Sequence, residues 1–377
     1  MSEHYQICKR CIMDTSDPDI VFDESGLCNH CKRYFEKEKR ELYLDDAGQQ
    51  RLEKLVATMK AKARDAEYDC IIGVSGGVDS TMVAYLAKKK LGLRPLAVHL
   101  DNGWNSELAV NNVERALKML DIDLYTYVLD WEEFRDLQLS FLKASVTNCE
   151  IPTDHAINAL LYRIASEKKI SYILSGSNVL SEGIYLPPTW GYDAKDWKHI
   201  KAVHKRFGSI KLNTFPHINA GMFLYLTFIK GIKFIPLLNY FEYVKDEAKG
   251  LLERELGWRD YGGKHYESIY TRFYQAYILP RKFNIDKRRV HLSTLICSKQ
   301  ITREQALEAL EEELYEPDKL VEDREFVIKK LGLTDDEFNG IMSQPIKSYR
   351  DYPSNYLFLK KWPFLLKWAR NIATGRT

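Results

Sequence analysis

The sequence has no marked excess of charge of either sign. Its 55 lysines and arginines are nearly balanced by 53 aspartates and glutamates, which leaves a formal net charge of +2 over 377 residues. Proteins that hold nucleic acids through bulk electrostatics carry a strong basic excess, because they must neutralise phosphates. The composition therefore argues against a nucleic-acid partner and leaves only a local basic patch open.

A secretory leader and a long uninterrupted apolar run are also missing. The N-terminus is polar, so we expect a cytoplasmic protein. The most apolar internal stretch, residues 217–241, contains lysines, Gly231 and Pro236, and a membrane-spanning helix needs about 20 apolar residues. This stretch predicts a buried helix, with membrane-surface docking or a subunit interface as alternatives. The aromatic and basic tail, residues 356–370, is expected to pack on the core rather than to lie on a membrane.

Neither common phosphate-loop signature describes the Ser-Gly-Gly loop at residues 75–77, which lacks the lysine of G-x-x-x-x-G-K-[ST] and the spacing of G-x-G-x-x-G. A β-branched apolar run precedes this loop, and apolar residues at helical spacing follow it. A helix N-terminus presents unpaired N–H groups and a positive dipole end, and hydroxyls at Ser75 and Ser80 add donors. The loop predicts a phosphate site. The alternative is an ordinary strand-to-helix turn capped by Asp79 or Ser80.

Strands and helices are expected to alternate through the middle of the chain. Predicted strands cover residues 68–74, 95–100, 124–129 and 172–175, and predicted helices cover residues 50–66, 79–91, 107–120, 132–143 and 154–168. This order indicates an α/β fold with a doubly wound parallel sheet. We divide the chain into an N-terminal zinc-knuckle module (1–45), an α/β core (46–185) and a mostly helical part for substrate or partner binding (186–377).

Two further turns are expected beside the phosphate loop. Ligands of doubly wound sheets bind beyond the carboxyl ends of the strands. Asp101 ends the second predicted strand, and Gly176, Ser177 and Asn178 follow the fourth. Each turn is expected to contact a nucleotide, although Asn-Gly and Gly-Ser-Asn are also common in plain turns.

Four of the seven cysteines form two C-x-x-C pairs. Residues 12–27 separate Cys8 and Cys11 from Cys28 and Cys31. This spacing is typical of four thiolates around one structural zinc ion, whose closed coordination sphere argues against zinc catalysis. An iron–sulfur cluster or a redox pair is the alternative. The neighbouring His30 is either a spare ligand or an exposed residue of the knuckle.

The other three cysteines are scattered. Cys70 lies in a predicted strand and Cys297 in an apolar-periodic segment, so both are expected to be small core residues. Cys149 stands in a turn ahead of a helix whose cap would be Thr153 or Asp154. As a nucleophile Cys149 would indicate sulfur chemistry, but no second cysteine is near in sequence, and a structural or site-lining role is favoured.

Cations and aromatic residues interleave late in the chain, on both sides of Pro280. Either a solvated helix face or a site for a phosphorylated or carboxylated substrate would explain this pattern. The candidate substrate-binding cations are Arg281, Lys282, Lys287, Arg288 and Arg289.

The hexapeptide SGGVDS at residues 75–80 resembles the pyrophosphate loop of the ATP pyrophosphatases, the PP-loop group that contains asparagine synthetase, GMP synthetase, NAD synthetase and the tRNA thiolases. In that group the loop grips the β- and γ-phosphates of ATP while a substrate oxygen attacks the α-phosphate. The resemblance implies that Asp101 lies near the adenosine and that Gly176, Ser177 and Asn178 close the nucleotide site. It further implies that pyrophosphate and Mg²⁺ are held by Ser75, Gly76, Gly77, Asp79 and Ser80.

Almost the whole chain is similar to the N-acetyl sugar amidotransferase family of the WbpG type, known from lipopolysaccharide biosynthesis. The similarity rests on the cysteine pairs followed by SGGVDS, on NCEIPTDHAIN at residues 148–158, on the Gly-Ser-Asn turn, and on the stretch from YTRFYQAYILPRKF to ITREQAL at residues 270–307. It implies ATP-dependent conversion of an acetamido group on a UDP-linked sugar into an acetamidino group. For the WbpG type, the substrate would be a diacetamido uronic acid destined for O-antigen.

The chemistry that the resemblance implies assigns further roles. Asp79 and Ser80 would serve the adenylation, and Asp154 or His155 would orient the amide or relay the ammonia proton. The late cations would hold UDP phosphates or a uronate carboxylate. The sequence shows no glutaminase nucleophile, so a separate glutaminase and a barrel subunit would supply ammonia. Association into a homo-oligomer is left open.

Two other functions fit parts of the sequence. A tRNA thiolase can combine zinc knuckles with this loop, but it would need catalytic cysteines and a basic RNA surface. A non-catalytic nucleotide-binding module would bind ATP without turnover. The near-neutral charge and the isolated Cys149 weigh against the thiolase, and the number of site-like motifs weighs against the passive module.

Overall fold

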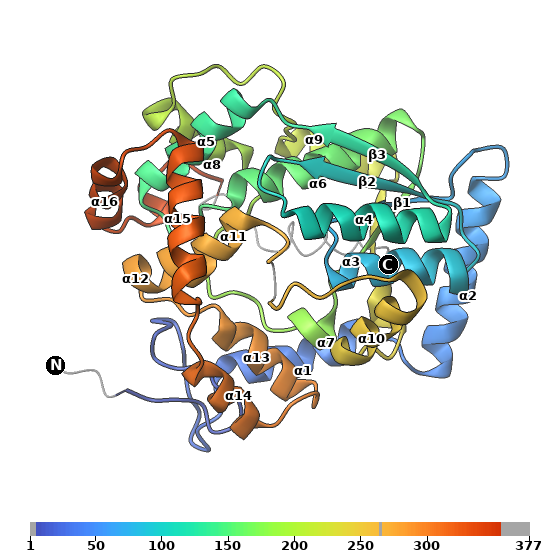
Figure 1. Ribbon diagram of the computed structural model, residues 1–377. Coiled ribbons are helices and arrows are strands. Elements are labelled where there is room, and N and C mark those ends of the chain that lie inside the picture. Colours follow the sequence, from blue (N-terminus) through green and yellow to red (C-terminus); the bar gives the residue numbers. More distant parts are fainter. Residues whose placement is uncertain (1–4, 264–265, 356–377) are drawn as a thin grey trace.

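The computed structural model describes residues 5–263 and 266–355. Its centre is a five-stranded parallel sheet with the strand order β3-β2-β1-β4-β5 (Figure 1). The strands are β1 (Cys70–Gly73), β2 (Pro95–Asp101), β3 (Asp123–Val128), β4 (Tyr172–Ser175) and β5 (Lys233–Pro236). The chain moves outward from β1 to β3 and then returns to the other side of β1. The predicted doubly wound α/β sheet is confirmed, and its topological switch point lies between β1 and β4.

Helices cover both faces of the sheet. They are α2 (Asp46–Lys62), α3 (Val78–Tyr85), α4 (Glu107–Leu120) and α10 (Lys245–Leu256) on one face, and α6 (Ile151–Glu167) and α9 (Ala220–Leu224) on the other. Alternate residues of β1 serve the two layers, as the period of two in a strand requires. Ile72 packs in the layer of α3 and α4, whereas Ile71 packs in the layer of α6.

A third apolar core joins the two ends of the chain. It contains the four clustered cysteines together with residues of the C-terminal helices, so the N-terminal module packs directly on the helical part. The helices outside the α/β layers are α1 (Asn29–Glu41), α5 (Trp131–Ala144), α7 (Val179–Glu182), α8 (Trp197–Phe207), α11 (Ile269–Phe273), α12 (Leu279–Phe283), α13 (Arg288–Cys297), α14 (Arg303–Glu311), α15 (Pro317–Leu331) and α16 (Asp335–Ser343). Single helical turns are η1 (Leu86–Lys90), η2 (Tyr225–Ile229), η3 (Leu237–Tyr240), η4 (Tyr274–Ile278) and η5 (Tyr349–Asp351).

The start of α6 differs from its prediction. The helix begins at Ile151 rather than at residue 154, and no side chain caps it. Pro152 occupies the first turn, where the missing N–H of proline costs nothing and its fixed φ favours helix. The predicted cap at Thr153 or Asp154 is therefore wrong, because both residues already lie inside the helix.

The prediction of one buried helix over residues 217–241 is also wrong. This stretch forms α9 and the turn η2, then reverses at Gly231, whose φ is +66°, and continues as strand β5 beside β4. A positive φ ends a helix and favours glycine, and a short apolar run after it can equally form a strand. The sheet therefore extends beyond the expected boundary at residue 185.

No helix within the two described ranges is both long and apolar enough to cross a bilayer. The predicted packing of residues 356–370 falls outside the described residues.

Candidate active site

The loop between β1 and α3 is shaped by close backbone contacts. Gly76 has a φ of +84°, and a Cβ atom there would lie 2.6 Å from the carbonyl oxygen of Ala109. The indole Nε1 of Trp258 donates a hydrogen bond of 2.8 Å to the Gly76 carbonyl oxygen. The oxygens of Ser75 and Ser80 lie 3.3 Å apart across the loop. Glycine at position 76 is thus required both by its φ and by the proximity of Ala109.

Helix α3 begins at Val78, and its N-cap residue, Gly77, provides no side-chain cap. The alternative interpretation, a plain turn capped by Asp79 or Ser80, is wrong because both residues lie in the first helical turn. The first N–H groups of a helix have no intrahelical partner, so an uncapped terminus favours an anion. A Cβ atom at Gly77 would lie 3.1 Å from Tyr261 Oη, so a side chain would fill the space in which an anion would sit.

A cavity of about 240 Å³ opens at this loop. Six predicted nucleotide residues line it, from the loops after β1 and β4: Ser75, Gly77, Asp79, Ser80, Gly176 and Ser177. A Cβ atom at Gly176 would lie 3.0 Å from the Asp79 backbone, so the two loops touch. The cavity therefore occupies the switch point of the sheet, where ligands of this fold class bind.

Asn178 and Asp101 do not line this cavity. The Asn178 side chain accepts a hydrogen bond from the N–H of Ser181 at 2.7 Å and donates one to the carbonyl of Gly176 at 3.1 Å. Asp101 Oδ1 accepts from the N–H of Gly103 at 2.8 Å. Both side chains shape their own turns, and their predicted contact with a nucleotide stays a prediction.

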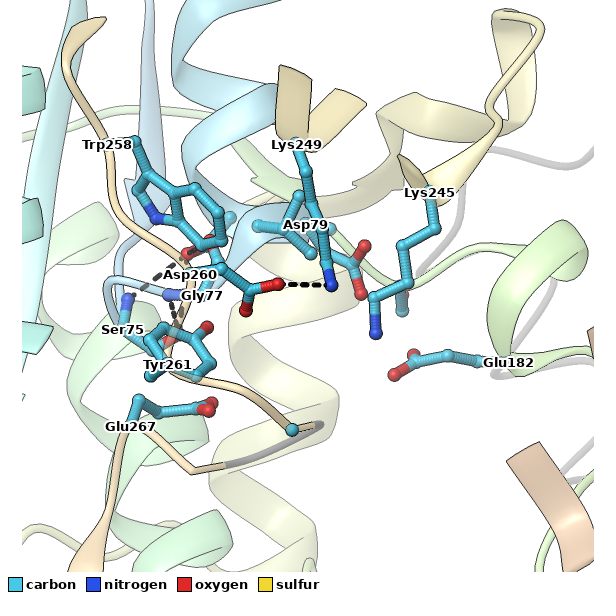
Figure 2. A pocket seen from close by; sticks show the side chains of 15 residues that line it. Ser75, Gly77, Asp79, Glu182, Lys245, Lys249, Trp258, Asp260, Tyr261 and Glu267 are labelled. Atoms are coloured by element: carbon cyan, nitrogen blue, oxygen red, sulfur yellow. Dashed lines mark hydrogen bonds and ion pairs between the residues drawn. The ribbon is translucent and has the colours of Figure 1, made fainter. Parts of the chain in front are cut away.

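The residues that form the other wall of the cavity, opposite the phosphate loop, were not predicted from the sequence. This wall comes from α7, α10 and the segment after α10, and consists of Glu182, Lys245, Lys249, Trp258, Asp260, Tyr261, Gly263 and Glu267 (Figure 2). The available signal was the mixture of glycines, aromatic residues and charges in GWRDYGGKHYE at residues 257–267. That mixture matches no established spacing, and about 180 residues separate it from the loop that it covers.

Hydrogen bonds anchor this segment at two places. Asn112 of α4 is buried, and its side chain pairs with the backbone of Arg259 at 2.7 and 2.9 Å. Further along, the N–H of Ser106 donates to the Glu267 carbonyl at 2.9 Å. The segment is therefore fixed to the loop after β2 and to α4, beside the cavity.

The cavity combines carboxylates with two lysines. Figure 2 shows Lys245 and Lys249 reaching from α10 towards Asp79 and Glu182, and Lys249 Nζ lies 2.5 Å from Asp260 Oδ2. Burial acts to raise the pKa of Asp260, but Lys249 and backbone N–H groups outweigh it and lower that pKa. Carboxylate oxygens are preferred by Mg²⁺, and lysines attract phosphates. The donor set therefore fits a magnesium-bound polyphosphate.

Two tyrosines hold protons beside Asp79. Tyr243 donates its hydroxyl proton to Asp79 Oδ1. Burial and the Asp79 carboxylate raise the pKa of Tyr243, and burial, Glu267 and Asp79 raise the pKa of Tyr261. Both phenols therefore remain protonated at neutral pH, and Tyr243 orients the Asp79 carboxylate.

The catalytic prediction for His155 is contradicted by its surroundings. The imidazole is buried and lies nearly parallel to the rings of Trp197 and Phe215, with its centroid 5.3 and 6.4 Å from theirs. Its Nδ1 lies 2.7 Å from the Ala194 carbonyl and its Nε2 accepts the N–H of Ile218 at 3.1 Å, so both nitrogens are used. Burial lowers the pKa of His155 to about 4. It serves as a neutral structural residue, and neither it nor the exposed Asp154 lines the cavity.

The late cations do not converge on a site. Lys282 donates to the carbonyl of Ile341, and Lys287 Nζ lies 3.4 Å from Glu150 Oε2. Arg288 binds Asp286 and three carbonyls near the end of α14, and Arg289 binds Asp14 at 3.0 Å. Four of the five are thus half-buried and bound to partners within the fold, and their predicted contact with a phosphorylated or carboxylated substrate stays a prediction. The exposed Arg281 lies over the Tyr277 ring, 4.5 Å from its centroid.

The isolated cysteines are structural. Cys149 is buried, its Sγ lies 3.4 Å from the Val146 carbonyl oxygen, and burial raises its pKa to about 12. This excludes a ready thiolate nucleophile. Cys70 is buried in β1 as predicted. Cys297 is buried as well, but its Sγ lies 3.8 Å from Cys31 Sγ, so it borders the cysteine cluster rather than an ordinary core.

The four N-terminal cysteines form a compact buried cluster. Their Sγ atoms all lie within 4.8 Å of one another, with Cys8–Cys31 at 3.9 Å and Cys11–Cys28 at 3.6 Å. A tetrahedron of sulfurs about 2.3 Å from zinc has edges of about 3.8 Å. The cluster can therefore bind a metal ion, and zinc fits it. His30 is no ligand and is not exposed, because it is buried and its Nε2 lies 2.7 Å from Asp17 Oδ2.

Two family models match the chain. One, described as the C-terminal domain of WbpG-like LPS biosynthesis proteins, matches residues 267–367, and the other, described as NAD synthase, matches residues 51–210. The two matches support the WbpG type within the PP-loop ATP pyrophosphatases. They also support an ATP-using enzyme of the ligase type with a general amidotransferase-like role, and the PP-loop fold implies ATP and Mg²⁺.

The curated relatives match different lengths of this chain. The uncharacterized protein MJ1599 of Methanocaldococcus jannaschii is 24% identical over 329 residues, which cover 82% of this chain and 96% of the relative. A glutamine-hydrolyzing GMP synthase of Pyrobaculum aerophilum is 39% identical over 84 residues, covering 22% of this chain and 15% of the synthase.

Two solved structures illustrate the structural comparison. The NH3-dependent NAD synthetase of Campylobacter jejuni is 19% identical with a TM-score of 0.28, covering 42% of this chain and 72% of the synthetase. The U34-tRNA thiolase NcsA of Methanococcus maripaludis, solved with its [4Fe-4S] cluster, is 16% identical with a TM-score of 0.33, covering 78% of this chain and 87% of the thiolase.

Proposed function

We propose that this protein is an ATP-dependent amidotransferase that converts an acetamido group of a UDP-linked N-acetyl sugar, a diacetamido uronic acid, into an acetamidino group for O-antigen biosynthesis. The observation that carries the proposal is the joining of a PP-loop cavity to a WbpG-like C-terminal domain in one chain. The cavity supports adenylation, and the C-terminal domain supports a lipopolysaccharide precursor as acceptor.

An amide is a poor electrophile, so its oxygen must first become a leaving group. The amide oxygen attacks the α-phosphate of ATP, the bond to the β-phosphate breaks, and pyrophosphate leaves with an adenylated imidate as the product. Ammonia then adds to the imidate carbon, AMP departs with the former amide oxygen, and loss of a proton gives the amidine. Both steps exchange one leaving group for one nucleophile.

The residues of this chain would serve the first step. The N–H groups at the start of α3 and the hydroxyls of Ser75 and Ser80 would bind the departing pyrophosphate, where negative charge develops. Asp79, oriented by Tyr243, and Glu182 would hold Mg²⁺. When bound, Mg²⁺ supplies positive charge that offsets the charge of pyrophosphate.

Ammonia would come from a separate glutaminase through a barrel subunit. All seven cysteines of the chain are buried, four of them in the metal cluster, which supports an external source. Free ammonium at high concentration should replace the glutaminase in vitro.

The decisive test is mass spectrometry of UDP-diacetamido uronic acids incubated with the protein, ATP, Mg²⁺ and ammonium. The proposal predicts a product in which one oxygen is replaced by NH, with equimolar AMP and pyrophosphate. Asp79→Ala should abolish pyrophosphate release while the circular dichroism spectrum stays unchanged. Absence of a sugar product even with glutaminase partners present, together with thiolation of a tRNA, would replace the proposal with the thiolase.

A further inference from the structure

Helix α13 lies between the cysteine cluster and the nucleotide cavity. It contacts α1 of the N-terminal module and α7, which ends at Glu182, and α1 and α7 also contact each other. Cys297 and Ser293 face the module: Cys297 Sγ lies 3.8 Å from Cys31 Sγ, and Ser293 Oγ accepts the N–H of Ile12 at 3.2 Å. Both side chains are buried.

Thr294, which follows Ser293 in α13, contacts the segment that carries the cavity residue Glu182. Thr294 is buried, and its Oγ1 accepts the N–H of Ile184 at 3.2 Å and donates to the Val290 carbonyl at 3.0 Å. Ile184 follows Glu182, which lines the cavity, by two residues. Thr294 therefore ties α13 to the backbone that carries Glu182.

Gln300, just after α13, extends this connection. Its Nε2 donates to the Leu180 carbonyl at 3.0 Å, and its Oε1 accepts the N–H of Lys245 at 3.1 Å. Lys245 also lines the cavity. Glu182 of α7 and Lys245 of α10, which both line the cavity, are thus positioned from the C-terminal end of α13.

The module also touches the Glu182 segment directly. Lys37 of α1 donates from Nζ to the Glu182 carbonyl at 3.4 Å. A Cβ atom at Gly183 would lie 2.4 Å from the Tyr34 ring, so helix α1 and this segment are in tight contact. A shift of the module would therefore move the Glu182 segment, because atoms that are closely packed leave no free space to absorb the shift.

We propose that α13 couples metal binding at the four cysteines to ATP binding at the cavity, with Cys297 and Thr294 as its two positioning residues. Metal fixes Cys31, Cys31 fixes the docking of α13, and α13 holds the Glu182 segment in place for the nucleotide. The inference rests on the proposed ATP site. Thermodynamic linkage requires the effect to be mutual, so bound ATP must stabilise bound metal by the same factor.

The test uses the full-length chain loaded with zinc. The extent of zinc release to a competing chromogenic chelator is measured at equilibrium with and without Mg²⁺ and ATP, which gives the zinc affinity, and ATP affinity is measured by calorimetry before and after metal removal. We expect ATP to raise the zinc affinity at least about fivefold, the lower end of typical coupling, and metal removal to weaken ATP binding by the same factor. Equal zinc affinities with and without ATP, in protein that binds ATP, would overturn the inference.

Thr294→Val separates coupling from zinc binding itself. It keeps the side-chain volume and all four thiolates, so zinc stoichiometry should stay at one while the ATP effect on zinc release disappears. Thr227→Val changes another buried threonine, in η2, and should leave the ATP effect intact. Wild-type coupling in Thr294→Val would refute the inference, and the wild-type experiment decides it alone if that variant does not fold. Failure of zinc-loaded wild type to bind ATP would refute the proposed function as well.

Discussion

At the scale of single residues, the cavity is defined by how few cations face its carboxylates. Asp79, Glu182, Asp260 and Glu267 line it against Lys245 and Lys249. Such a site would repel the triphosphate of ATP unless the lysines and Mg²⁺ offset the acidic charge. Lys249 already sits in an ion pair with Asp260, so ATP and Asp260 would compete for one ammonium group.

This competition predicts opposite effects of two substitutions. Lys249→Ala should weaken ATP binding at least about tenfold, because a charge-assisted hydrogen bond contributes about 1.5–3 kcal/mol. Asp260→Asn should strengthen it, since the ammonium group is released and one negative charge is removed. Calorimetric titration with ATP and Mg²⁺ measures both. Arg254→Ala, an exposed cation on the same helix that does not line the cavity, is the matched control, and equal losses in Lys249→Ala and Arg254→Ala would contradict the assignment.

His155 gives a prediction about pH. Its pKa is lowered to about 4 by burial, whereas an unfolded histidine titrates near pH 6.5. Below pH 6.5 the unfolded chain takes up a proton that the folded chain refuses, so the free energy of unfolding falls as the pH falls from 6.5 to 4. Between pH 7.5 and 5.0 this loss amounts to about 2 kcal/mol for one such histidine.

His155→Gln should lower the free energy of unfolding at pH 7.5. It should also abolish the part of the decrease between pH 7.5 and 5.0 that comes from His155. Urea unfolding at pH 7.5 and 5.0 gives the difference for each variant. His217→Gln, which removes a ring stacked on Trp197, controls for loss of an imidazole. A pH dependence as steep in His155→Gln as in the wild type would show that His155 is not the buried neutral group described.

At the scale of elements, local patterns predicted the strands and helices between residues 70 and 175, because each carries its own period and turn signals. They also placed Ser75, Asp79 and Gly176 at one edge of the sheet. β5 was missed because its four residues follow a helical apolar run. The wall from residue 243 to 267 was missed because its role depends on contacts with Gly76 and Asn112, which are remote in sequence.

A comparison of Gly76 in the phosphate loop with Gly262 separates two costs of replacing glycine by alanine. One is the cost of a positive φ, and the other is the steric clash of the added Cβ atom. Gly76 and Gly262 have φ angles of +84° and +82°, but a Cβ atom at Gly76 would meet a backbone oxygen at 2.6 Å, while one at Gly262 would meet nothing within 4 Å. In Gly262→Ala the free energy of unfolding should therefore fall only by the conformational cost of about 1–2 kcal/mol. In Gly76→Ala it should fall by distinctly more. Urea unfolding measures both, and equal losses would mean that Ala109 yields without cost.

At the scale of the whole molecule, the N-terminal module is not an independent appendage. Its cysteines share an apolar core with α5, α8 and the C-terminal helices. Arg303 donates to the carbonyls of Cys8 and Cys11 at 3.3 Å. The spacing of the cysteines predicted which residues could bind the metal. It did not predict how the module packs, because the helices that it contacts are remote in sequence.

Loss of metal should therefore destabilise the entire chain. Cys11→Ser is expected to lose the bound metal and to lower the melting temperature in a single transition, because metal-binding free energy contributes directly to folding. Elemental analysis and calorimetry measure the two quantities. Cys149→Ala removes a buried thiol outside the cluster and should keep the metal content of the wild type. A separate early transition in Cys11→Ser, with the main transition unchanged, would contradict the shared core.

The meeting of Gly76, Ala109 and Trp258 carries an evolutionary consequence. The three residues come from the phosphate loop, α4 and the segment after α10, yet the Gly76 backbone touches both of the others. A side chain at position 76 would meet the backbone of residue 109 whatever residue stands there, and loss of the indole would leave the Gly76 carbonyl without the Trp258 donor. Lineages that descend from this chain should accordingly vary freely in residue type at position 109, while glycine at 76 and an N–H donor at 258 are retained together.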